Sequence, residues 1–163
     1  RCVDTAALMI EGADRTHKVV NTHTIEIVEQ RLLVEPGSFV LDIQQAAPYF
    51  RKQGALGFIN SFVNNALPGM KHPITGVFDV LELLYHTHPT QHNGLSLAVS
   101  HDTILAAIVA VISGNKQIEQ SDWPDMMEGL FVWFEGEDFS NSKLKWIWRG
   151  QKHELVIKDF QNK

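Results

Sequence analysis

The sequence has little of several features that would narrow its class at once. It contains one cysteine, Cys2, among 163 residues, which excludes an internal disulfide and slightly favours a reducing compartment such as the cytoplasm. It also has no apolar run of membrane-spanning length, because the longest run, around 104–112, is much too short. We therefore expect no membrane partner.

Positively charged residues are also fewer than negatively charged ones. The chain has 14 Lys and Arg against 19 Asp and Glu, a formal net charge of −5. A general nucleic-acid interface needs a broad basic face, so we expect no nucleic-acid partner. An anionic substrate remains compatible with this charge if a few arginines gather in one pocket. Length and composition otherwise fit a single domain over residues 1–163.

The order of apolar segments predicts both helices and strands. Apolar residues at helical spacing predict helices at 1–11, 55–66, 76–86 and 103–113. Shorter apolar runs predict strands at 95–99, 130–134 and 143–149, with an edge piece at 154–157. The run 25–37 fits a strand or a short helix, and its Pro-Gly pair ends it.

A buried strand, a loop and an apolar helix follow one another over residues 95–113. A unit of this kind builds a parallel sheet. We therefore predict an α/β fold, a three-layer sandwich in which helices cover both faces of a mostly parallel sheet.

Polar residues stand at the junction of that strand and helix, where the sequence reads Ser-His-Asp-Thr over 100–103. Ligands of open α/β sheets bind at the carboxyl ends of strands, and a helix N-terminus favours an anion. His101 can donate a hydrogen bond to a phosphate oxygen, and Asp102 can give a proton to a leaving group. The structural alternative makes Asp102 a helix cap and His101 an ordinary loop residue.

The segment LAVSHDTILAAIVAVISG resembles the second signature of the histidine phosphatase superfamily, the group of acid phosphatases and phosphoglycerate-mutase-like enzymes. In that family an apolar strand ends in a histidine; in the acid-phosphatase branch Asp-Thr follows, before an apolar helix closed by Gly. The opening RCVDTAALMIEG is similar to a second family segment, in which an arginine precedes a small Thr-Ala pair on a helix. WPDMMEGLFVWF and the hairpin after it are similar to the acid-phosphatase ending.

The resemblance implies a phosphomonoester hydrolase that uses a phosphohistidine intermediate and no cofactor, with a phosphorylated small molecule or phosphoprotein as substrate. It implies that Arg1 and His101 bind the phosphoryl group, and that His101 and Asp102 are catalytic, Asp102 as proton donor. In the mutase-like branch the proton donor is a glutamate after the arginine helix. The segment RLLVEPGSF makes Glu35 that alternative catalytic acid.

The family's Arg-His-Gly motif, which carries the attacking histidine, is absent: none of the eight histidines lies between an Arg and a Gly. We therefore expect the chain to be the C-terminal part of such a domain, incomplete at its N-terminus and inactive alone, with a missing N-terminal segment of the same domain as its partner. The alternative is a non-catalytic binding or interaction domain. A third hypothesis places a metal on His86, His88 and His92, but their spacing and Pro89 disfavour it, and we expect no metal.

Overall fold

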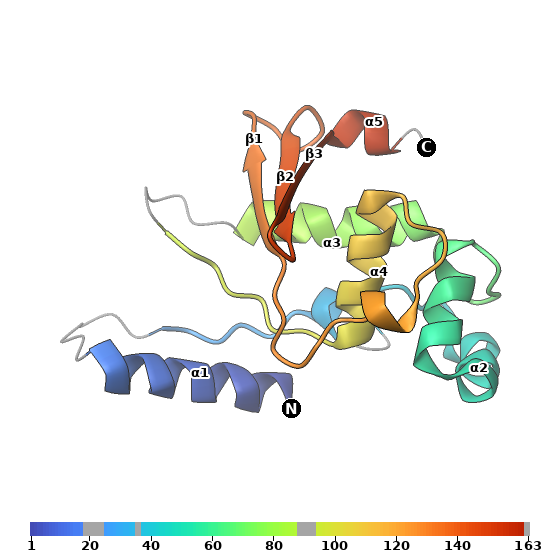
Figure 1. The fold of residues 1–163 in the computed structure, drawn as a ribbon, viewed down its shortest axis with the longest axis horizontal. Helices are drawn as coiled ribbons and strands as arrows, with labels where there is room; N and C mark the ends of the chain where they lie inside the picture. The colour runs from blue at the N-terminus through green and yellow to red at the C-terminus, as the bar shows by residue number, and fades with distance from the viewer. Residues whose placement is uncertain (18–24, 35–36, 88–93, 162–163) are drawn as a thin grey trace.

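The computed structural model describes residues 1–17, 25–34, 37–87 and 94–161. These residues form helices and a small sheet that lies at one side of them, beside α5 (Figure 1). The helices are α1 (Cys2–His17), α2 (Ile43–Val63), α3 (Pro73–Thr87), α4 (Asp102–Ser113) and α5 (Ile157–Gln161), with 3-10 turns η1 (Arg31–Leu33) and η2 (Gln120–Asp122). The strands are β1 (Phe131–Glu135), β2 (Lys143–Trp148) and β3 (Gln151–Val156). None of the described helices is long and apolar enough to cross a lipid bilayer.

The sheet is antiparallel, with the strand order β1-β2-β3. Its strands follow one another through short connections, and antiparallel pairing is what such connections allow, whereas parallel strands need a long crossover. The two strands predicted at 130–134 and 143–149 are confirmed, and the edge piece begins earlier, at residue 151. The predicted three-layer sandwich with a mostly parallel sheet and helices on both faces is wrong.

The strand predicted at 95–99 is also wrong. This segment has no regular secondary structure, and Leu95 and Leu97 are 80% and 62% exposed. Residues 25–30 are likewise without regular structure, before η1 begins. In the described part of the chain, no backbone hydrogen bond joins either segment to a neighbouring strand. The apolar run is therefore present, but the neighbouring strands that a buried strand requires are not.

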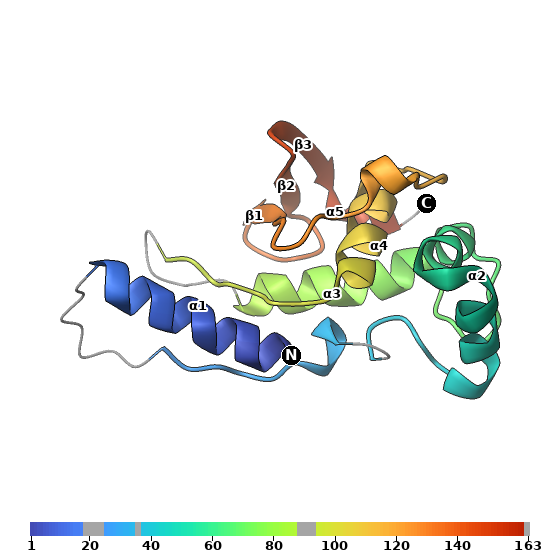
Figure 2. The same cartoon turned by 60° about the horizontal axis from the view of Figure 1, so that its bottom comes forward.

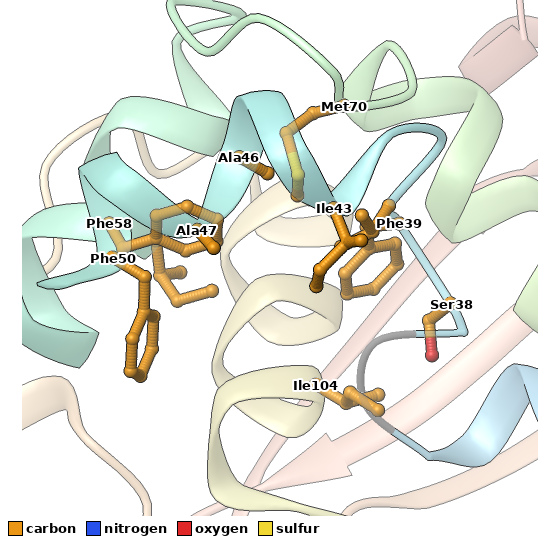
Figure 3. A pocket seen from close by; sticks show the side chains of 11 residues that line it. Ser38, Phe39, Ile43, Ala46, Ala47, Phe50, Phe58, Met70 and Ile104 are labelled. Carbon is orange, nitrogen blue, oxygen red and sulfur yellow. The ribbon is translucent and has the colours of Figure 1, made fainter.

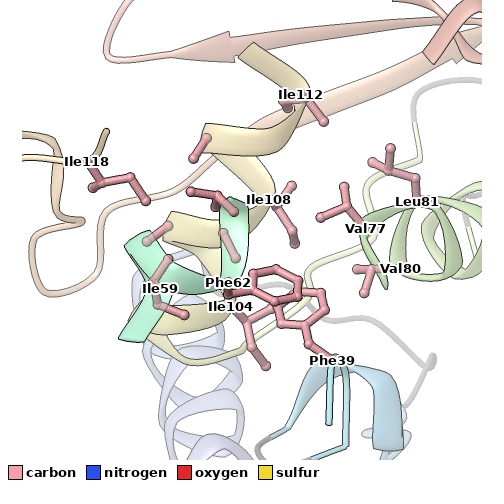
Figure 4. Close-up of a cluster of buried hydrophobic side chains, with 14 of the residues drawn as sticks. Phe39, Ile59, Phe62, Val77, Val80, Leu81, Ile104, Ile108, Ile112 and Ile118 are labelled. Carbon is pink, nitrogen blue, oxygen red and sulfur yellow. The ribbon is translucent and has the colours of Figure 1, made fainter. Parts of the chain in front are cut away.

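The main core lies between α2, α3 and α4 (Figure 4). Phe62 of α2 is 1% exposed and stacks on Phe39, with ring centroids 4.8 Å apart. Val77 and Leu81 of α3 are completely buried against the same cluster. α4 is nearly all apolar and is buried on several sides, as its sequence predicts, and Gly114 ends it in the left-handed conformation.

α2 is longer than the helix predicted at 55–66 and changes direction inside its length. Gly54 has φ 67° and ψ 178°, a conformation that is almost restricted to glycine, and it separates two helical halves. The first half begins at Asp42, whose carboxylate accepts hydrogen bonds from the amides of Gln44 and Gln45. The sequence pattern missed this half because Pro48 indicates a break, although the structure accommodates it inside the helix.

α1 lies beside the extended residues 25–30, as the two views show (Figures 1 and 2). One stripe of the helix is half-buried, at Cys2, Thr5, Ala6, Met9 and Ile10. This spacing is that of one helix face. The helix is thus docked through small and flexible side chains, with its N-terminal end toward the start of α4.

Candidate functional site

The start of α4 carries the predicted site residues. His101 is the N-cap residue, with extended backbone (φ −98°, ψ 151°) and a half-buried side chain that makes no cap hydrogen bond. Its carbonyl accepts the first helical hydrogen bond, from the amide of Leu105 at 3.1 Å. His101 therefore marks the N-terminus of α4, where the free amides of the first turn favour an anion.

α1 brings the beginning of the chain to this point. The thiol Sγ of Cys2 lies 3.7 Å from Nε2 of His101, a contact between residues 99 positions apart. Arg1 directly precedes Cys2, so the structure places it beside the start of α4. Its side chain is 96% exposed. The guanidinium therefore lies at the surface and not in a closed pocket.

Asp102, the first residue of α4, holds two hydrogen bonds on its carboxylate. Oδ1 accepts from the amide of Thr103 at 2.8 Å, and Oδ2 accepts from the indole Nε1–H of Trp123 at 2.9 Å. The first bond is local, to the next amide along the chain, and the N-cap position that the structural alternative gave to Asp102 is taken by His101. The second fixes the direction of the carboxylate next to His101, and sequence analysis did not anticipate it.

A clamp centred on Arg149 holds the loop that carries Trp123. The guanidinium donates to both carboxylate oxygens of Glu128, at 2.8 and 2.9 Å, and to the carbonyl of Trp123 at 2.9 Å. The hydrogen bond from Arg149 lowers the pKa of Glu128, and the same bond raises the pKa of Arg149. No local sequence signal marks this clamp, because its members are 21 and 26 residues apart.

The turn η1 connects to the site through a serine. Ser100 Oγ donates to the carbonyl of Leu33 at 2.7 Å. The hydroxyl of Ser38 donates to the preceding carbonyl, that of Leu32. The residue before His101 and the segment before α2 are therefore fixed to the same short turn.

The remaining predicted residues lie elsewhere or cannot be placed. Glu35, the alternative acid, and His88 and His92 of the histidine cluster lie outside the described residues. His86 is exposed near the end of α3. Within the described ranges, no group of three or more His, Cys, Asp or Glu side chains could hold a metal ion.

The indole bond to Asp102 can be tested by a double-mutant cycle. Trp123→Phe keeps the ring and removes the donor, and Asp102→Ala removes the acceptor. Because the bond is charge-assisted but exposed, we expect a coupling free energy of about 0.5–1 kcal/mol in urea unfolding. Trp133→Phe combined with Asp102→Ala is the matched control and should show no coupling. Equal coupling for the two tryptophans would contradict the assignment.

Together these residues offer an imidazole donor, a helix N-terminus, a directed carboxylate and, one residue before Cys2, an exposed arginine. This set is suited to binding an anion with oxygen atoms and to moving one proton. Comparison with known proteins adds no relative: no family model matches the chain, and neither a curated protein nor a solved structure matches it.

Proposed function

We propose that the start of α4 binds the phosphoryl group of a phosphomonoester, in a hydrolase that acts through a phosphohistidine intermediate. One observation carries this proposal, the contact of Cys2 with His101 at 3.7 Å. Arg1 is the neighbour of Cys2, so the contact supports a shared phosphate site for Arg1 and His101, the two residues that the family resemblance assigns to phosphate.

The roles follow from the chemistry of each group. His101 donates from its ring to a phosphoryl oxygen, and the amides of the first turn of α4 add their partial positive charge. The guanidinium of Arg1, on a long and exposed side chain, turns toward the bound anion and forms charge-assisted hydrogen bonds. Asp102 is held by Trp123 on the same side of the helix start.

In the reaction, a histidine nitrogen forms a bond to phosphorus while the bond from phosphorus to the leaving oxygen breaks. Asp102 in its protonated form gives its proton to that oxygen, so an alcohol leaves. The carboxylate then takes a proton from the water that cleaves the phosphohistidine and releases inorganic phosphate. The attacking histidine belongs to an Arg-His-Gly motif, which the 163 residues do not contain, so the proposal gives this chain the binding and proton-transfer groups.

A non-catalytic binding domain is the second candidate. The observation that favours it is the exposure of apolar side chains on the two extended segments, with Val28 at 62% and Leu95 at 80%. Exposed apolar residues of this kind are typical of contact surfaces for other polypeptides. The two candidates can be distinguished with a longer polypeptide that contains these residues and an upstream Arg-His-Gly segment. Treated with a phosphomonoester, this polypeptide should form an acid-labile phosphohistidine if it is a hydrolase and should form none if it is a binding domain.

Phosphate binding is tested on the chain itself. We expect inorganic phosphate and orthovanadate to shift the ring signals of His101 in NMR spectra. His101→Ala should weaken the affinity about tenfold or more, and Arg1→Gln should weaken it severalfold, because each removes a charge-assisted or ring hydrogen bond. His72→Ala, an exposed histidine before α3, is the control and should bind as the original chain does. Absence of binding, or equal binding by all variants, would overturn the proposal.

A further inference from the structure

A cavity of about 270 Å³ lies between the two halves of α2, the segment before α2 and the start of α4 (Figure 3). Ile43, Ala46 and Phe50 line it from the first half of α2. Phe58 and Ile59 line it from the second half, so the kink at Gly54 shapes the space. A cavity of about 150 Å³ holds one benzene molecule, so this one has room for an apolar group of about ten heavy atoms.

The chemistry of the walls is selective. Ser38 is the one polar residue among those that line the cavity, and its hydroxyl already donates to the carbonyl of Leu32. A sugar or inositol ring placed here would leave its hydroxyl groups without partners, which costs free energy for each group. An alkyl or aryl group would lose no hydrogen bonds in the cavity, and its transfer out of water would stabilise the complex.

The cavity is open to solvent at one side. Ile43 and Phe50 are 47% and 40% exposed, although both line it. Phe50 packs edge-on against Phe58, with ring centroids 5.4 Å apart, which keeps the wall in place at the opening. A ligand can therefore enter without unfolding of α2.

The cavity lies close to the site at the start of α4. Ile104, which lines it and is 1% exposed, belongs to the first turn of α4, three residues after the N-cap residue His101. A second connection runs through η1, where consecutive carbonyls accept from Ser38 of the cavity wall and from Ser100 next to His101. The phosphate site and the cavity are thus built on the same turn of α4 and the same 3-10 turn.

We propose that this cavity binds the apolar part of the leaving alcohol, so that the substrates are phosphate esters of alkyl or aryl alcohols. This inference rests on the proposed function. It adds a substrate class, because the phosphoryl group binds at the start of α4 and the adjoining alcohol extends along Ile104 into the cavity.

The test compares n-hexylphosphonate with methylphosphonate and inorganic phosphate, titrated into the chain by calorimetry and NMR. The two phosphonates share one head group and differ only in chain length. We expect the hexyl compound to bind at least tenfold more tightly than the methyl compound and to shift the methyl signals of Met70 and Ile104. The affinities for both phosphonates should weaken when His101 is replaced by alanine, because they share the head group that His101 binds.

Ala47→Phe fills the cavity from the first half of α2 and should abolish the preference for the hexyl compound while phosphate still binds. Ala55→Phe, on the same helix but outside the cavity lining, is the matched control. If Ala47→Phe does not fold, Phe50→Gln at the opening serves the same purpose. Equal affinity for the two phosphonates, with phosphate still bound, would overturn the substrate class alone. Binding of the hexyl compound to His101→Ala as tightly as to the original chain would also overturn it, because the head group would then bind elsewhere, whereas failure of every ligand to bind would overturn the proposed function.

Discussion

Replacing Phe62 by alanine should lower the free energy of unfolding by about 3–5 kcal/mol. The side chain is 1% exposed, and its ring stacks on Phe39 at 4.8 Å in the centre of the cluster that α2, α3 and α4 share. Alanine leaves a cavity, and α2, α3 and α4 cannot all move inward to fill it. Urea unfolding followed by circular dichroism measures the loss, which is a large fraction of the total stability of a single domain.

The matched control is Phe131→Ala on β1. Phe131 is 63% exposed, so the same chemical change removes little buried surface and should alter the free energy of unfolding by about 0.5 kcal/mol or less. Similar losses in the two variants would show that the core does not lie between α2, α3 and α4.

Gly69→Ala should lower the free energy of unfolding by about 2–4 kcal/mol, for two reasons. Gly69 has φ 73°, which side chains rarely adopt, and an added Cβ would lie 2.5 Å from the carbonyl oxygen of Asp42 and 2.8 Å from Cβ of Gln45. The carbonyl of Gly69 also accepts from the amides of Leu41 and Asp42, at 2.8 and 2.9 Å. Any shift that relieves the crowding therefore disturbs the start of α2.

Gly12→Ala gives the opposite expectation. Gly12 lies inside α1, and a Cβ added there would meet no heavy atom within 4 Å apart from its chain neighbours and the backbone of its own helical turns. Alanine in a helix interior is favoured over glycine by about 0.5–1 kcal/mol, so this variant should keep or raise stability. The two variants are compared by the same urea unfolding curves, and a loss of equal size in both would contradict the account of Gly69.

Local sequence signals predicted some elements well. α4 combines an apolar run, polar residues at its start and Gly114 at its end, so propensity, capping and burial agree. The hairpin of β1 and β2 has two alternating segments around a polar turn, which determine its pairing without distant residues. These elements are encoded within a few neighbouring positions.

Elements that depend on distant residues were not predicted. LSLAV has the composition of a buried strand, but burial requires neighbouring strands, and Leu97 is instead 62% exposed. The same limit applies to the site. His101 and Asp102 could be identified from their position before an apolar helix, whereas the bond from Trp123 and the clamp of Arg149 depend on how the later loop folds back.

The docking of α1 has a consequence for how the protein unfolds. The described half-buried stripe of α1 contains small and flexible side chains, and no described residue of α1 belongs to the buried core cluster, whose large side chains come largely from α2, α3, α4 and β2. Detachment of α1 would separate Cys2 from His101 and carry Arg1 away, while the rest of the domain kept its packing. Two free energies therefore govern this protein, a small one for local opening and a larger one for global unfolding. Anion binding at the start of α4 would depend on the free energy of local opening. A variant can therefore change the affinity of the site without changing the melting temperature of the domain.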